Sequence, residues 1–315
     1  MKDIDPNRPP ARFKITEDPA LTSQPGESLR FEQVSPTFGP DVPRHTDVSN
    51  WELFEGMLLA VSFSDRERDW MLGSAVLVAP GIALCAAHVI NEHMDELLDA
   101  KLGAICFGIA RSGAQAWRIG IVTRVPGHDV CFLGLQCASA LPSTRTFYQA
   151  TITTRLPAIG ERLVIAGFRP TDKSFPRGEN KDLIEMGGIV TVSSGVVTQR
   201  FPHGRDTLLA PWPSIEIDCP AWGGMSGGPV FDSRGFLLGL ISRSMETLDE
   251  PSPMLSSLLW PVLGHRIDGG WPISNKQKSL LDLNGAVCKI DRPDAVSVEI
   301  DEVARRVRTS YAAWT

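Results

Sequence analysis

Residues 223–230 read GGMSGGPV, which places Ser226 among four glycines and ahead of an apolar run. Glycine tolerates positive φ and lets a backbone come close to a ligand, so this crowding predicts a tight turn with N–H groups turned toward a negative charge. The N–H groups of Gly224 and Ser226 could hold the oxyanion of an acyl-transfer intermediate. The hydroxyl of Ser226 is then the candidate nucleophile, and it needs a base and a group that orients the base.

A candidate base follows a predicted β-hairpin. Residues 74–78 (SAVLV) and 82–87 (IALCAA) are apolar runs separated by a Pro-Gly pair, a combination typical of two strands joined by a turn. His88 comes directly after the second run, at the predicted exit of the strand. His93 lies further along a polar helical pattern and is the poorer candidate.

A candidate acid stands at the head of another apolar strand. Residues 128–135 read HDVCFLGL, with Asp129 just before the apolar run. Asp95 and Asp99 are rivals, but the helical pattern places both on a surface. The candidate groups therefore occur in the order His88, Asp129, Ser226.

These segments resemble the blocks of trypsin/chymotrypsin-like serine proteases, especially the bacterial and high-temperature-requirement-type relatives. The histidine block is GSAVLVAPGIALCAAHVI, the aspartate block DVCFLGL and the serine block GGMSGGPV, while GFLLGLIS resembles the strand that follows the serine. The resemblance covers roughly residues 57–263. It implies an all-β fold of two six-stranded antiparallel β-barrels, with the active site in the cleft between them.

The strand pattern agrees with a barrel architecture, because strand-like runs recur at short spacing with little helix. We expect strands of the first barrel at residues 57–63, 70–78, 82–87, 104–110, 116–124 and 130–136. The second barrel is expected to draw on residues 151–156, 161–168, 184–199, 214–219, 228–231, 236–242 and 255–262.

Four regions follow from this interpretation. Residues 1–50 hold eight prolines and form an extended arm, either loose or draped over a barrel. The alternative is that this arm covers the active site or binds a partner. Residues 51–137 form the first barrel and 138–263 the second. Residues 264–315 form a C-terminal extension, with helical spacing predicted at 275–283 and 301–313.

The resemblance also implies a role for each group. Ser226 attacks the scissile carbonyl, His88 takes its proton and later gives it to the leaving amine, and Asp129 orients the imidazole. The N–H groups of Gly224 and Ser226 form the oxyanion hole. The hydroxyl of Ser242 is expected near Asp129, where it can hydrogen-bond the carboxylate.

The specificity pocket is expected at five residues: Pro220, Ala221, Trp222, Arg243 and Ser244. Cleavage after lysine or arginine needs an acid at the pocket floor, where this sequence has the proline. We therefore expect cleavage after a small or medium apolar residue, with preference for an acidic residue through the arginine as the alternative.

Met225 departs from the secreted enzymes, which carry an aspartate just before the serine that pairs with a newly cut N-terminus. That kind of activation is unavailable to a methionine. Our hypothesis is that apolar packing of Met225 holds the oxyanion loop, which becomes ordered only when something binds.

The composition narrows the possible partners and the cellular location of the protein. The net charge of −6 argues against nucleic acid as a partner, and no run approaches the ~20 apolar residues of a membrane helix. No secretory signal is visible, and the six cysteines contain no CxxC pair, which argues against a zinc site and favours buried, reduced thiols. We expect a cytoplasmic protein without metal or cofactor, with a peptide or protein substrate and an activating or inhibiting protein partner.

The expected function is that of a serine endopeptidase, and two alternatives stay open. A trypsin-like domain that has lost turnover would serve as a protein-binding module. The pattern Gly224-x-Ser226-x-Gly228 also fits the nucleophile elbow of an α/β-hydrolase esterase, but only His265 follows the serine and the upstream region is rich in strands.

Overall fold

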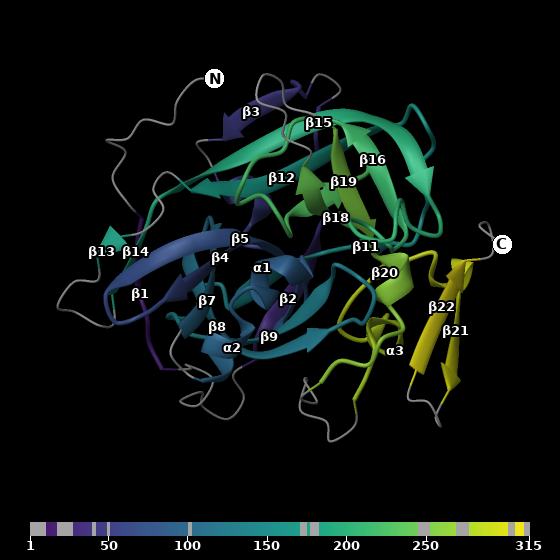
Figure 1. Ribbon diagram of the computed structural model, residues 1–315. Helices are drawn as coiled ribbons and strands as arrows, with labels where there is room; N and C mark the ends of the chain where they lie inside the picture. Colours follow the sequence, from purple (N-terminus) through teal and green to yellow (C-terminus); the bar gives the residue numbers. More distant parts are fainter. Residues whose placement is uncertain are drawn as a thin grey trace.

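The computed structural model describes most of the chain (Figure 1). The described residues are 11–17, 28–39, 42–48, 51–99, 103–170, 175–176, 183–244, 253–268, 277–301 and 306–311. Strands predominate throughout, and the helices are short.

Six antiparallel strands close into the first barrel, in the order β5-β4-β7-β8-β9-β6 with β6 returning to β5. They are β4 (Leu58–Ser64), β5 (Arg68–Ala79), β6 (Ile82–Cys85), β7 (Gly103–Ala110), β8 (Gly113–Arg124) and β9 (Cys131–Cys137). Every residue of β4 and β6 is buried, as expected for short apolar runs in a closed barrel. The six expected strands are confirmed within a few residues.

The second barrel closes in the same way, in the order β17-β12-β15-β16-β19-β18 with β17 pairing β18. Its strands are β12 (Arg162–Pro170), β15 (Gly188–Phe201), β16 (Ser214–Asp218), β17 (Pro229–Phe231), β18 (Leu237–Ser244) and β19 (Met254–Leu258). The expected fold of two six-stranded antiparallel barrels is confirmed. Residues 152–153 form β11 (Ile152–Thr153), which extends this sheet by pairing β18 in parallel.

The N-terminal arm adds short strands to both halves of the molecule. β1 (Ala11–Lys14) pairs β14 (Leu183–Met186), β2 (Arg30–Val34) pairs β10 (Thr146–Ala150) in parallel, and β3 (His45–Val48) pairs β15. Figure 1 shows β3 alongside β15, which it joins at the edge of the second barrel. The described part of the arm is therefore draped over the barrels. β13 (Phe175–Pro176) similarly extends the first barrel at β5.

Short helices and turns complete the described structure. They are η2 (Trp51–Phe54), α1 (Ala87–Asn91), α2 (Met94–Leu98), η3 (Trp260–Val262), α3 (Leu280–Leu283) and η4 (Pro293–Ala295). In the part of the chain that the structure covers, no helix is long and apolar enough to span a bilayer.

The C-terminal extension corrects the helix predictions. Only four residues of 275–283 are helical, as α3, and 275–276 lie outside the described residues. The helix predicted at 301–313 is wrong where the structure describes it, because β21 (Val296–Asp301) and β22 (Arg306–Tyr311) form an antiparallel hairpin. The spacing of Val307 and Tyr311 by four residues fits a period of two as well as a helix, and β-branched residues with a pairing partner decide for strands.

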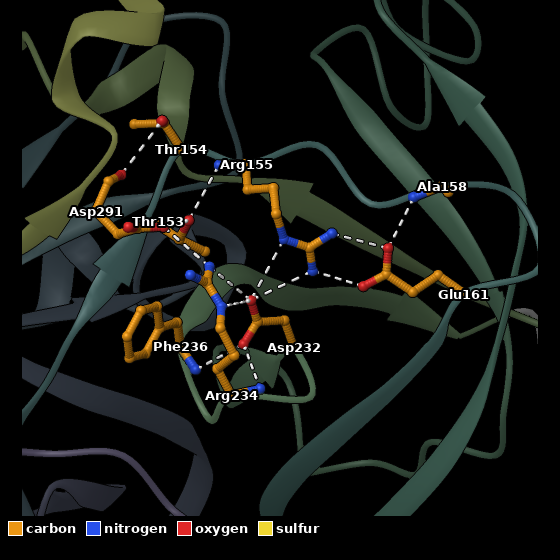
Figure 2. A network of polar contacts seen from close by, with 9 residues as sticks. All are labelled: Thr153, Thr154, Arg155, Ala158, Glu161, Asp232, Arg234, Phe236 and Asp291. Atoms are coloured by element: carbon orange, nitrogen blue, oxygen red, sulfur yellow. Dashed lines mark hydrogen bonds and ion pairs between the residues drawn. The ribbon is translucent and has the colours of Figure 1, made fainter.

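A network of ion pairs fastens this extension to the second barrel (Figure 2). The Asp232 carboxylate is 1% exposed and accepts hydrogen bonds from the guanidinium groups of Arg155 and Arg234. Arg234 also donates to Asp291 of β20 (Ile290–Asp291), at 2.9 Å. Because β20 pairs β11, the network and the sheet together hold the extension in place.

Candidate active site

His88 lies in α1, directly after the buried strand β6. The backbone of Ala86 caps this helix in an extended conformation, so the chain turns from strand to helix just before the histidine. The His88 N–H donates to Oδ1 of Asp129 at 3.0 Å, and its Nδ1 lies 3.0 and 2.9 Å from the two carboxylate oxygens. The imidazole is 27% exposed and the carboxylate 4% exposed. The helix thus fixes the histidine backbone and ring against one acid.

This contact selects one tautomer of the imidazole. An ionised carboxylate can only accept hydrogen bonds, so the proton of a neutral His88 stands on Nδ1, where it is donated to Asp129. The lone pair is then on Nε2, the nitrogen that a general base would use. The arrangement therefore prepares the ring to receive a proton from a hydroxyl.

Ser242 brings the second barrel to the same carboxylate. Its hydroxyl, on β18 and 1% exposed, donates to Oδ2 of Asp129. The carboxylate comes from the turn before β9 of the first barrel, so this bond joins the two barrels. Asp129 is held between the histidine and the serine, which leaves its oxygens little freedom to turn.

The serine loop forms a hydrogen-bonded turn. The Met225 N–H donates to the Trp222 carbonyl at 3.0 Å, and Gly224, the third residue of this turn, has φ +90°. Because φ is positive at Gly224 but not at Gly223, this is a type II turn, which glycine adopts without strain. Met225 itself is 0% exposed and packs against Gly167 of β12. The loop that carries Ser226 is therefore anchored in the core of the second barrel.

The loop of Ser226 and the segment of His88 pack against each other. A Cβ at Gly227 would lie 2.8 Å from the backbone nitrogen of Ala86, two residues before the histidine. A Cβ at Gly73 would lie 2.7 Å from the side chain of Val89 and 3.1 Å from the Ser226 carbonyl oxygen. These close approaches need glycine and bring the serine loop of one barrel onto the histidine helix of the other.

The residues expected at the specificity pocket line an apolar part of the second barrel. Pro220 and Ala221 are buried, Trp222 and Ser244 are half-buried, and Arg243 is exposed. The neighbouring Ile241, Met254 and Met225 are also buried and belong with Ala221 to one apolar cluster.

The N-terminal arm contacts residues at and next to the expected pocket. Arg44 pairs with Asp218 at 2.7 Å, next to the buried Cys219. The ring of Trp222 contacts His45, whose ring centroid is 5.4 Å away, and the guanidinium of Arg169, at 4.5 Å. The sequence alone did not point to these contacts, since nothing local marks which barrel strand the arm joins.

The region that holds these residues matches a known family. Residues 73–240 match the sequence model of the trypsin-like peptidase domain. The chain belongs to the trypsin-like peptidase family. As a peptidase of this family it is a serine endopeptidase that acts on peptides or proteins. Among the described residues, no group of three or more histidine, cysteine, aspartate or glutamate side chains could hold a metal ion.

Solved structures similar to this peptidase include proteases from different sources. Deg5 is 15% identical, with a TM-score of 0.46 over 65% of this chain and 84% of its own. The active form of the Rv3671c protease from M. tuberculosis is 13% identical, with a TM-score of 0.45 over 75% and 88%. Neuropsin of mouse brain is 15% identical, with a TM-score of 0.44 over 65% and 89%. The comparison with curated proteins found no match. The family assignment therefore stands on the sequence match.

Proposed function

We propose that this peptidase cleaves peptide bonds through an acyl-enzyme on Ser226, with His88 as the base and Asp129 as the group that orients it. The observation that carries the proposal is the placement of His88 Nδ1 within 3.0 Å of both Asp129 oxygens, on a helix packed against the serine loop. Acyl transfer by a serine needs a nucleophile, a base that activates it and an acid that orients the base.

The proposed reaction has two halves. In the first, Nε2 of His88 takes the hydroxyl proton as Ser226 Oγ bonds to the scissile carbonyl carbon; the imidazolium then protonates the amine, which leaves. In the second, water attacks the acyl carbon, gives its proton to His88 and releases the acid, while the proton returns to Ser226. The N–H groups of Gly224 and Ser226 are proposed to bind the oxyanion in both halves. Among the described residues, neither N–H donates to a backbone carbonyl, so both are available.

The pocket wall supports cleavage after a small apolar residue. Ala221 at the expected pocket is apolar and buried, as are Ile241, Met225 and Met254 of the same apolar cluster. The nearby Asp218 is paired with Arg44 and therefore offers no uncompensated charge to a basic side chain. Arg243 is exposed and would add a preference for acidic residues elsewhere on the substrate.

Regulation of this site is proposed to act through the N-terminal arm. β3 lies along β15, and His45 contacts the ring of Trp222 while Asp47 pairs with Arg169 beneath that ring. A partner that lifted β3 would remove these supports from the pocket wall. We expect Asp47→Asn to change cleavage-site preference or KM while kcat on small ester substrates stays close to that of the wild type.

Cysteine usage supports a reducing compartment such as the cytoplasm. All six cysteines are free thiols, although Cys85 and Cys131 stand opposite each other on β6 and β9. Burial, with Cys131 alongside, raises the pKa of the Cys85 thiol well above its usual value, which favours a packing role over reactivity. Alkylation of the unfolded protein from cells under non-reducing conditions would count these thiols; recovery of fewer than six contradicts the proposal.

A fluorophosphonate probe tests the reaction directly, because it phosphonylates only an activated serine. We expect stoichiometric labelling of Ser226 by peptide mapping, loss of labelling and peptide hydrolysis in Ser226→Ala, and normal behaviour in Ser233→Ala, an exposed serine seven residues away. A wild-type protein that binds peptides but neither reacts nor hydrolyses them would instead be the protein-binding module.

A further inference from the structure

Ser74 is a buried serine on β5 of the first barrel whose hydroxyl and backbone N–H contact the serine loop and β12 beside it. The side chain is 0% exposed. Its hydroxyl donates to the Gly224 carbonyl at 2.9 Å and accepts the Phe168 N–H at 2.9 Å. Its backbone N–H donates to the Ser226 carbonyl at 2.8 Å. Ser74 of the first barrel thus hydrogen-bonds both ends of the segment from Gly224 to Ser226, which belongs to the second barrel.

The hydrogen-bond partners of Ser74 determine where its hydroxyl proton is donated. A serine hydroxyl has one proton to donate, and an N–H can only donate. Because the Phe168 N–H occupies a lone pair, the Ser74 proton must go to the Gly224 carbonyl. The site is closed to solvent, so no alternative partner competes. The bond therefore holds the peptide plane between Gly224 and Met225 in a single orientation.

This peptide plane adjoins the one between Gly223 and Gly224, which carries the Gly224 N–H that is proposed to bind the oxyanion. A type II turn requires positive φ at Gly224, and rotation of its central peptide, between Gly223 and Gly224, converts it to a type I turn with the Gly224 N–H facing the other way. The Ser74 hydroxyl stabilises only the orientation that presents the Gly224 carbonyl to the first barrel. Gly227 approaches the Ser74 carbonyl so closely that a side chain there would collide with it, which fixes the other side of Ser226.

We propose that Ser74 is a positioning residue that holds the Gly224–Ser226 segment in its oxyanion-binding conformation. The inference rests on the proposed role of Ser226 and adds a residue outside the nucleophile, base and acid. Oxyanion donors act on the charge that develops in the transition state, so their misplacement lowers kcat more than it weakens substrate binding.

The test compares Ser74→Ala with the wild type and with Ser62→Ala, a buried serine of neighbouring β4 whose hydroxyl contacts Met186 and not the serine loop. We expect Ser74→Ala to lower kcat by about 10- to 100-fold with KM within about twofold, and Ser62→Ala to change neither. A peptide aldehyde forms a tetrahedral adduct whose oxygen occupies the oxyanion site, so its inhibition constant should rise in Ser74→Ala in proportion to the loss of kcat. Ser74→Thr, which keeps the hydroxyl, should recover much of the activity.

The outcomes separate this inference from the proposed function. If the wild type reacts with a fluorophosphonate at Ser226 but Ser74→Ala keeps the kcat and aldehyde affinity of the wild type, Ser74 is not a positioning residue. Equal loss of kcat in Ser62→Ala and Ser74→Ala would assign the effect to general destabilisation and likewise overturn the inference. If the wild type is not labelled at Ser226 at all, the proposed function fails and the inference fails with it.

Discussion

The Ser242 hydroxyl lies 2.5 Å from Oδ2 of Asp129, although 113 positions separate the two residues in the chain. One residue belongs to the second barrel and the other to the first, so the bond crosses the boundary between them. With the two donors of His88, it gives the buried carboxylate three hydrogen-bond donors. These donors hold the Asp129 carboxylate in one position, and the carboxylate in turn holds the imidazole ring of His88.

Removal of this bond should weaken catalysis moderately. A hydrogen bond to a charged group is worth about 1.5–3 kcal/mol, but Asp129 retains both His88 donors. Ser242→Ala is therefore expected to lower kcat/KM by about 10-fold, measured with a chromogenic peptide. Ser257→Ala is the matched control: it is buried on the adjoining β19, and its hydroxyl has no partner among the described residues. A wild-type rate in Ser242→Ala would show that the bond has no part in orienting the acid.

Replacement of the acid should select the wrong tautomer. The side-chain amide of Asp129→Asn can donate to Nδ1 of His88, which moves the ring proton to Nε2 and removes the lone pair that the reaction needs. We expect kcat to fall on the order of 10⁴-fold with an unchanged melting temperature. Asp95→Asn on α2 is the control, since this acid is exposed and should leave kcat unaltered. A fall of less than tenfold in Asp129→Asn would remove Asp129 from the proposed trio.

Crowding at Gly167 should disturb the serine loop without unfolding the barrel. A Cβ at this residue of β12 would lie 2.8 Å from Cα and Cβ of the buried Met225, so the loop must shift. Gly167→Ala is expected to slow fluorophosphonate labelling at least 10-fold while the circular dichroism spectrum stays that of a folded protein. At Gly120 of β8 the nearest atom to an added Cβ is 3.9 Å away, and Gly120→Ala serves as the control. Equal labelling rates in both variants would contradict the anchoring role of Met225.

The network in Figure 2 should contribute to stability. Asp232 is 1% exposed and lies between Arg155 and Arg234, so its neutralisation leaves two cations without their shared partner. Asp232→Asn is expected to lower the free energy of unfolding by about 3 kcal/mol, measured by urea denaturation. The exposed Asp294→Asn should change it little. Should the two variants unfold at the same urea concentration, the network would be shown to contribute nothing.

His128 should make the folded protein less stable at mildly acidic pH. Burial, with His265 nearby, lowers its pKa to about 4, whereas the unfolded chain takes up this proton near pH 6.5. The unfolded state therefore binds more protons between these values, and stability falls as the pH is lowered from 6.5 toward 4. His128→Asn should flatten this part of the profile, with the wild type losing roughly 2 kcal/mol more than the variant between pH 7 and pH 4.5. Parallel profiles for the two proteins would contradict the assignment.

Local patterning explains why so much of the fold could be predicted. Alternating apolar runs and Pro-Gly or glycine-rich turns mark strands through contacts between near neighbours, and the strands of the first barrel follow them closely. The same reasoning fails at residues 306–311, where a spacing of four residues satisfies both a helix and a strand. There the pairing with β21, set by the rest of the fold, decides the conformation.

The family and the candidate serine, histidine and aspartate could be recognised in the amino-acid sequence because each candidate lies in a short contiguous block. The two-barrel architecture followed from that resemblance and from the local strand patterns. The hydrogen bond from Ser74 to the serine loop and the pairing of β3 with β15 became visible only in the folded molecule. Such contacts join segments that are remote in the chain. Their geometry depends on which strands pair and in what register, and no local pattern encodes that choice.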